Sequence, residues 1–124
     1  MTRHLPRLWR FRLLRAVHAK GAAPNRQLLA AWAKAEGGTA RYNPLNTTEP
    51  WPGATDYNSV GVKNYPTGAA GIAATAATLV NGHYTGIVHD LRAGGFTAAQ
   101  MVERNGPQFD TWGTGAANIL RLLT

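Results

Sequence analysis

Residues 28–46 read LLAAWAKAEGGTARYNPLN, and this stretch decides how we interpret the chain. Its first half has the apolar spacing of a helix that ends on Glu36, and a glycine pair at 37–38 and an Asn-Pro turn at 43–44 follow. The C-terminal end of a helix carries partial negative charge, and the apolar ring of Trp32 would keep water away. Both conditions disfavour the charged carboxylate and so favour the protonated form of Glu36. A general acid must be protonated before it can donate a proton to the substrate. The alternative interpretation is that Glu36 is the polar end of an exposed helix.

The composition is that of one globular domain. The chain has 124 residues, of which 44% are hydrophobic, enough for a single core. It contains no cysteine, which excludes disulfides and thiolate metal sites. The four histidines are scattered along the chain, so we predict no metal site, and nothing indicates an organic cofactor.

Positive charge is concentrated at the start of the chain. Residues 1–41 contain nine Lys or Arg and one acid, a balance of +8, whereas residues 42–124 contain four and five, a balance of −1. The total is the formal net charge of +7. A basic front half indicates an anionic polymer as partner, either nucleic acid or a bacterial wall rich in phosphate and carboxylate. A basic helix that serves only solubility is the alternative.

The N-terminal region predicts a basic amphipathic helix within residues 1–22. Arginines at positions 7, 10, 12 and 15 interrupt each apolar stretch, so we predict no signal peptide. No apolar run approaches the ~18 residues of a membrane span. The expected inner stripe of this helix is at helical spacing and contains Leu8, Phe11, Leu14 and His18.

The rest of the chain predicts a mainly α fold, with five or six helices around one irregular segment. Asn25 is expected to cap a helix over 25–36. Residues 37–66 are rich in Gly, Pro, Asn and Tyr and predict a cleft segment, irregular or with a small β-ribbon. Residues 67–124 predict the helical remainder. Thr67 is expected to cap a helix whose many Ala and Gly residues predict close helix packing. A capping box of Thr97 and Gln100 opens another helix that Asn105-Gly106-Pro107 ends, and TWGTG at 111–115 leads into the last helix.

Six acidic residues limit where acid–base chemistry can occur. Two of them, Asp90 and Glu103, fall on late helices, and we expect both to be solvated. Asp110 is expected to cap or turn before the last helix. A second carboxylate opposite Glu36 would complete the layout of a glycoside hydrolase. We prefer Asp56 for this role, with Glu49 as the alternative.

The cleft segment also contains residue types that bind sugars. Aromatic rings offer flat apolar faces and neighbouring amides and hydroxyls offer hydrogen bonds, a combination that suits N-acetylated sugars. The alternative for any single residue is a structural role, because a Gly- and Asn-rich loop also needs asparagines to form turns and aromatic side chains to anchor it. The candidate substrate-binding residues are Asn43, Asn46, Trp51, Tyr57, Asn58, Ser59 and Tyr65.

Two stretches carry a family resemblance, AEGGTARYNPLN at 35–46 and YNSVGVKNYPTGAAGIAATAATL at 57–79. Together they resemble the lysozyme-like domains of actinobacterial phage and wall-degrading proteins, and more distantly lytic transglycosylases and goose-type lysozymes. In those families a helix-end Glu precedes a Gly-Gly-Asn-Pro-like turn and a serine-containing segment. This chain has a longer Trp- and Pro-containing loop between the turn and Ser59. That departure leaves hydrolysis and anhydro-forming cleavage both open.

The resemblance implies a single lysozyme-like domain over 1–124 that cleaves the glycan strands of bacterial peptidoglycan. It implies that Glu36 protonates the glycosidic oxygen and that Ser59 and its neighbours line the sugar subsites. Tyr84 would match a tyrosine that transglycosylases place near their acid. Without a signal peptide, such an enzyme would act on the cell wall in a phage lysis or virion context.

Two other functions remain open from the sequence. A non-catalytic wall-binding or virion structural domain could keep the same fold and grip glycan with the same aromatic residues. A nucleic-acid-binding protein could use the basic front half. We do not favour nucleic acid, because no helix-turn-helix or RNA-binding motif is present and the aromatic residues cluster away from the basic region.

Overall fold

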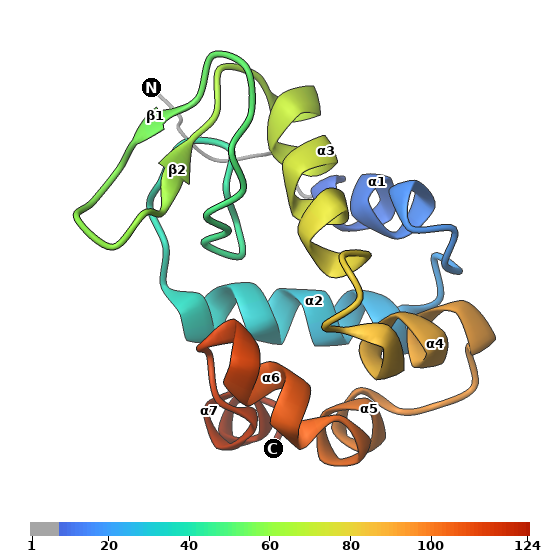
Figure 1. The fold of residues 1–124 in the computed structure, drawn as a ribbon. Coiled ribbons are helices and arrows are strands. Elements are labelled where there is room, and N and C mark those ends of the chain that lie inside the picture. Colours follow the sequence, from blue (N-terminus) through green and yellow to red (C-terminus); the bar gives the residue numbers. More distant parts are fainter. Residues whose placement is uncertain (1–7) are drawn as a thin grey trace.

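The computed structural model describes residues 8–124 and is mainly helical, as the sequence predicts (Figure 1). The side chains of every helix in this range contribute to one hydrophobic core. No helix in the described range is long and apolar enough to cross a membrane. Seven helices and one two-stranded sheet occur there, in the order α1 (Trp9–Ala16), α2 (Ala23–Glu36), β1 (Thr55–Asp56), β2 (Lys63–Asn64), α3 (Gly68–Leu79), α4 (Thr85–Ala93), α5 (Ala98–Arg104), α6 (Gly106–Trp112) and α7 (Ala116–Leu122).

Helix α2 runs through the middle of the molecule (Figure 1). The hairpin, α3 and α1 lie on one side of it, and α4 to α7 lie on the other. Its buried face includes Leu28, Leu29 and Trp32, each 0% exposed. The helix begins two residues earlier than predicted, with Pro24 in its first turn. Asn25 is therefore not the cap; its buried amide donates to the carbonyls of Lys20 and Leu91.

The predicted inner stripe of α1 is wrong. Leu8 and Phe11 are 57% and 42% exposed, and His18 is exposed beyond the helix end. Of the predicted stripe only Leu14 is buried. The observed inner face contains Trp9, Leu13, Leu14 and Val17. Both sets have helical spacing, so periodicity alone could not choose between them; the structure buries the set that contains Trp9. The part of the predicted helix over residues 1–7 lies outside the described range.

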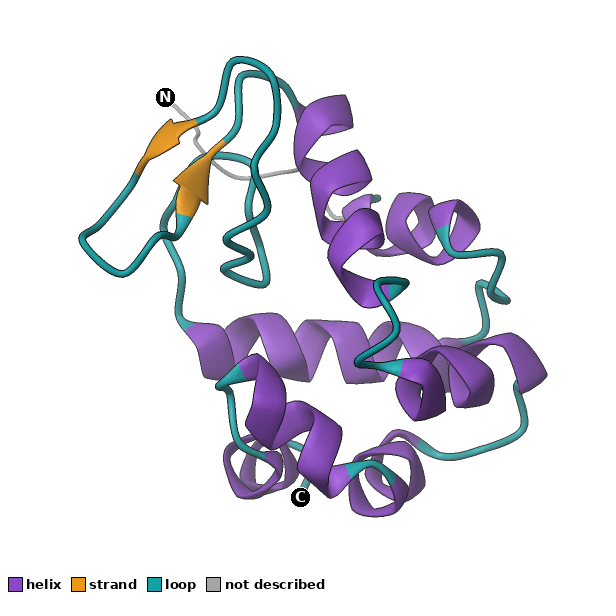
Figure 2. Cartoon of the chain, viewed as in Figure 1, coloured by secondary structure: helices purple, strands orange, loops and turns teal. Residues whose placement is uncertain are grey.

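The predicted small β-ribbon in the segment 37–66 is present. Strands β1 and β2 pair antiparallel, with Thr55 opposite Asn64 and Asp56 opposite Lys63. The rest of the segment is loop and turn (Figure 2). Asn43 fastens the loop to the hairpin, because its amide donates to the carbonyl of Thr47 at 2.9 Å and to that of Lys63 at 2.8 Å.

Helix α3 packs closely against the start of this segment. Thr67 caps it as predicted, accepting a hydrogen bond from the amide of Ala70. A Cβ at Gly71 would lie 1.9 Å from the carbonyl oxygen of Tyr42. Only glycine permits that approach. This agrees with the close packing that the small-residue composition of the helix predicts.

The chain after residue 94 forms one helix more than the sequence analysis foresaw. The capping box of Thr97 and Gln100 opens α5 as predicted. As predicted, that helix ends at Arg104, directly before Asn105-Gly106-Pro107. The additional helix is α6, which begins at Gly106. The carboxylate of Asp110, on α6, then accepts from the amide of Ala116 in the first turn of α7 at 3.0 Å, the predicted capping role.

Asp90 is buried, not solvated as predicted. Its side chain is 1% exposed and receives hydrogen bonds from Arg104 (2.9 and 3.2 Å) and Asn105 (2.9 Å), and His89 lies 3.0 Å away. Burial alone would raise the pKa of Asp90, but these hydrogen bonds and the charge of Arg104 outweigh it and lower the pKa to about 2. The ion pair connects α4 to the end of α5.

We predict that Asp90→Asn lowers the free energy of unfolding at neutral pH by on the order of 2 kcal/mol. The folded pKa lies below the unfolded value, so the carboxylate stabilises the fold above about pH 4 and this contribution is lost as pH falls toward 2. Urea unfolding between about pH 2 and pH 7 measures it. Glu103→Gln, at an exposed position on α5, is the control. Equal pH dependence in wild type and Asp90→Asn would contradict the assignment.

Candidate functional site

The candidate site begins at the last residue of α2. Gly37 adopts the left-handed conformation (φ 60°) and its amide bonds to the carbonyl of Ala33, which ends the helix directly after Glu36. The Glu36 side chain is partly buried at this end. Because the helix C-terminus is the negative end of the helix dipole, the carboxylate needs hydrogen-bond donors from elsewhere in the fold.

Two successive hydrogen bonds connect one oxygen of Glu36 to Trp32 in the core, with Thr114 between them. The indole Nε1 of Trp32 donates to the hydroxyl of Thr114 at 2.8 Å, and that hydroxyl donates to Oε2 of Glu36. Trp32 and Glu36 are four residues apart, so they share a face of α2. An indole N–H can only donate, so the Thr114 oxygen must accept from it, and its single hydrogen is directed to the carboxylate.

The other oxygen of Glu36 is held by the segment 37–66. Asn46 Nδ2 donates to Oε1 at 2.9 Å and also lies 3.3 Å from the main-chain carbonyl of Glu36. Asn46 has a left-handed backbone (φ 57°), which Asn tolerates better than most residues. A Cβ at Gly38 would lie 2.1 Å from Asn46 Oδ1, so this arrangement requires glycine there. In this orientation Oδ1 is buried without a hydrogen-bond partner among the described residues.

Aromatic rings pack around Trp32, the residue that donates to Thr114. Trp32 makes edge-to-face contacts with Phe109 and Trp112, each with ring centroids 4.9 Å apart. Trp112 contacts Tyr84 in the same way at 5.0 Å, and its indole donates to the carbonyl of Leu45 at 2.8 Å. This cluster therefore connects α2, α6 and the start of α4 to the loop that contains Asn46. Burial raises the pKa of Tyr84.

Asp56, the preferred second carboxylate, lies on the hairpin. Its Oδ1 is 2.6 Å from Nζ of Lys63, its partner across the two strands, and its side chain is 74% exposed. Glu36 bonds instead to Asn46 and Thr114. The described contacts therefore do not bring the two predicted catalytic carboxylates together, and Asp56 has a cation of its own.

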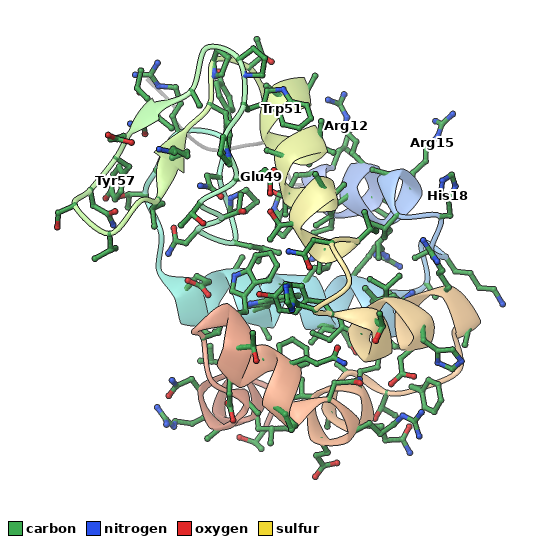
Figure 3. The ribbon with its side chains drawn as sticks, in the orientation of Figure 1. Arg12, Arg15, His18, Glu49, Trp51 and Tyr57 are labelled. Atoms are coloured by element: carbon green, nitrogen blue, oxygen red, sulfur yellow. The ribbon has the colours of Figure 1, made fainter. Side chains whose placement is uncertain are left out.

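Glu49 lies deeper. Its side chain is partly buried and points into the space between the segment 37–66 and α3 (Figure 3). The Thr78 hydroxyl lies 3.5 Å from Oε1 of Glu49, and Thr47 and Thr78 are 2.5 Å apart. The phenol of Tyr65 donates to the carbonyl of Glu49 at 2.7 Å. Burial, and next the charge of Glu49, raise the pKa of Tyr65 to about 12, although a hydrogen bond with Thr47 opposes them.

The remaining sequence-predicted residues fall into exposed and buried groups. Tyr57, Asn58 and Ser59 are exposed on the hairpin loop, and the phenol of Tyr57 is hydrogen-bonded to the hydroxyl of Thr39, three residues after Glu36. Trp51 is partly buried near α3 (Figure 3). The buried ones are Asn43 (2% exposed), Tyr65 (1%) and Tyr84 (7%), all with partners inside the protein.

Two surface pockets lie away from Glu36. One, of about 580 Å³, opens between the end of α3 and α4 and includes Val80, Thr85, Val88 and Arg92. The other, of about 520 Å³, involves α2, α5 and the end of α7 and includes Gln27 and Lys34. Among residues 8–124, no group of three or more His, Asp or Glu is placed to hold a metal ion.

Thr114 contacts Glu36 from the far end of the chain and is not among the residues predicted from the sequence. It lies in the stretch 111–115, TWGTG, which we interpreted only as a lead into the last helix. Its two flanking glycines both have positive φ, 105° at Gly113 and 86° at Gly115. A threonine between two glycines is a signal of a constrained turn, but nothing in the sequence says that this turn reaches residue 36.

The chain was compared with known proteins at three levels. A scan against models of protein families, a search of curated proteins and a search of solved structures found no match. The resemblance to lysozyme-like domains therefore stays a prediction from the sequence.

We predict that the phenol of Tyr65 titrates near pH 12 in the folded protein. The folded pKa lies above the unfolded value of about 10, so the fold loses stability as pH rises from about 10 toward 12. Absorbance of phenolate against pH measures it. Glu49→Gln should move the titration part of the way toward pH 10, because burial remains. An unchanged titration in that variant would show that Glu49 does not face Tyr65.

Proposed function

We propose that this protein cleaves the glycan strands of bacterial peptidoglycan and that Glu36 is its general acid. The observation that carries the proposal is the placement of Glu36: a partly buried carboxylate at a helix end, held between Asn46 from the irregular segment and Thr114 from the turn before α7. Neither a metal nor an organic cofactor enters the proposal. The sequence resemblance supplies the substrate class.

The Thr114 hydroxyl suits a group that must gain and lose a proton. When Glu36 is charged, the hydroxyl donates to it. When Glu36 is protonated, the second lone pair of Thr114 can accept the acidic hydrogen while the first still accepts from Trp32. The same residue can therefore hold the carboxyl group before and after it protonates a glycosidic oxygen.

The exposed polar and aromatic groups near the site are the proposed sugar contacts. Tyr57, Asn58 and Ser59 project from the hairpin loop, and the Thr39 contact brings Tyr57 back toward the end of α2. Asn46 would position the acid instead of binding sugar, since its amide is used by Glu36. The buried residues Asn43, Tyr65 and Tyr84 would shape the site from behind.

For the carboxylate that activates water, the contacts in the structure favour Glu49 over Asp56. Asp56 forms an ion pair with Lys63 and is largely exposed, and no described contact connects it to Glu36. Glu49 is partly buried and lies beside the hydroxyls of Thr47 and Thr78, and it forms no ion pair among residues 8–124. We therefore propose that any protein carboxylate that activates water is Glu49, and that otherwise an acetamido group of the substrate takes this role.

We predict that Glu36→Gln folds normally, binds purified sacculi and is nearly inactive. The amide keeps the shape of the side chain but cannot donate a proton, and general-acid catalysis contributes roughly 10²–10⁴ in rate. Loss of turbidity of sacculi measures the rate, and mass analysis of the fragments identifies the bond. Reducing ends would indicate hydrolysis and anhydro ends a transglycosylase.

Two companion variants test the second carboxylate. Asp56→Asn should keep most of the activity, whereas Glu49→Gln should lose it if Glu49 activates water and keep it if the substrate does. Wild-type activity in Glu36→Gln, or cut peptides in place of cut glycan, would refute the proposal. A wild type that binds sacculi without cleaving them would identify a wall-binding domain.

We predict that Thr114→Val lowers the cleavage rate by roughly 10- to 100-fold, the value of a hydrogen bond to a charged group. Thr114→Ser keeps the hydroxyl and should stay close to wild type. Because the two variants differ in the hydroxyl, the comparison separates its role from packing at this position. Equal activity in the two would mean that Thr114 does not assist Glu36.

A further inference from the structure

Several cations come from α1 and from residues at or in contact with the connection between α1 and α2, a connection that lies on the right-hand side of Figure 1. Arg12 and Arg15 are three residues apart on α1 and extend outward from it (Figure 3). The other members are attached to the connection itself by the contacts described next. We call this group the cationic surface; it consists of Arg12, Arg15, Lys20, Arg26 and Arg92.

Backbone carbonyls hold three of these cations in place. Arg92 Nε donates to the carbonyl of Val17 at 2.8 Å, Lys20 Nζ to that of Ala93 at 3.2 Å, and Arg26 Nε to that of Gly21 at 3.1 Å. A carbonyl is neutral, so these bonds fix the side chains without cancelling their charge. The guanidinium of Arg26 also lies 4.8 Å from the centroid of the Phe11 ring.

No carboxylate neutralises the cationic surface within residues 8–124. The ion pairs in this range are those of Lys63 with Asp56 and of His89 and Arg104 with Asp90. Asp90 is the acid on α4, but it is 1% exposed and occupied by its own partners. Uncompensated like charges repel one another and cost stability, so they indicate an anionic partner.

The end of α1 adds to this surface at a conformational cost. His18 has a left-handed backbone (φ 60°) at the position after the helix where glycine is favoured. Its amide bonds to the carbonyl of Arg15, and the amide of Ala19 bonds to that of Leu14, which closes the helix end. Glycine would close it with less strain, but only a side chain presents an imidazole beside Arg15 (Figure 3).

The 580 Å³ pocket adjoins the cationic surface, because Arg92 belongs to both. Its lining includes the hydroxyl-bearing Thr85 and the apolar Val80 and Val88. Its described lining contains no Phe, Tyr or Trp on which a nucleic-acid base could stack, and its one aromatic ring, that of His89, is hydrogen-bonded to Asp90. A pocket of this kind suits a polyol or sugar substituent better than a base.

We propose that the cationic surface binds a phosphodiester polymer of the bacterial wall, a chain of polyol or sugar phosphates, and so holds the protein on the wall that contains its glycan substrate. The choice of a wall polymer over nucleic acid rests on the proposed function and on the pocket lining. Phosphates would contact the guanidinium and ammonium groups, and a substituent of the polymer would enter the pocket beside Arg92.

The test measures binding of soluble poly(glycerol phosphate) to the folded chain of 124 residues at about 50 mM and about 200 mM salt. Arg12→Gln/Arg15→Gln/Lys20→Gln should bind roughly ten-fold more weakly than wild type, with a flatter salt dependence. Lys34→Gln/Arg41→Gln/Arg121→Gln removes the same charge at exposed positions elsewhere and should bind like wild type. Arg12→Lys/Arg15→Lys keeps the charge and should also bind like wild type.

Two outcomes would overturn the proposal. Equal weakening in both triple variants would show that net charge, not this surface, attracts the polymer. Binding to duplex DNA as tight as binding to poly(glycerol phosphate) would assign the surface to nucleic acid. Glu36→Gln separates this proposal from the proposed function: it should bind the polymer like wild type, and it would still do so if glycan cleavage were disproved.

Discussion

The hydrogen bond from Trp32 to Thr114 is the contact on which the candidate site depends. Trp32 is fully buried, so its N–H needs a partner inside the protein, and an unpaired buried donor would cost about 1–3 kcal/mol. Thr114 satisfies that need and in doing so directs its own hydrogen to Glu36. The requirement to satisfy one indole in the core thus places a hydroxyl beside the carboxylate, and it joins α2 to the turn before α7.

Close backbone approaches hold the opposite side of the site. The segment 37–66 contains little regular structure, yet several of its residues are tightly specified. Tyr42 and Asn46 adopt left-handed conformations, and glycines at 38 and 71 leave the space that they need. The indole of Trp112 then binds the carbonyl of Leu45. An irregular segment fixed in this way can hold a side chain such as Asn46 as firmly as a helix would.

Most of the acidic residues have contacts elsewhere in the fold, so they do not neutralise the cationic surface. Asp90 connects α4 to α5 from inside the core, Asp110 caps α7, and Asp56 pairs across the hairpin. Glu36 and Glu49 lie near the irregular segment. None of these is free to neutralise the arginines around the α1–α2 connection. Four of the nine cations in residues 1–41, namely Arg12, Arg15, Lys20 and Arg26, therefore belong to the cationic surface.

Local sequence determined the elements whose cause is local. The mainly α fold, the end of α2 at Glu36-Gly37, the Thr67 cap and the Thr97–Gln100 capping box all follow from neighbouring residues, and each is present. The tertiary structure decided what depends on distant partners: which face of α1 is buried, that Asp90 is a core residue, and that Thr114 reaches Glu36 across 78 positions of chain. Helical periodicity fits two faces of α1 equally well, and no local pattern encodes a hydrogen bond between residues so far apart, because only packing of the whole core brings them together.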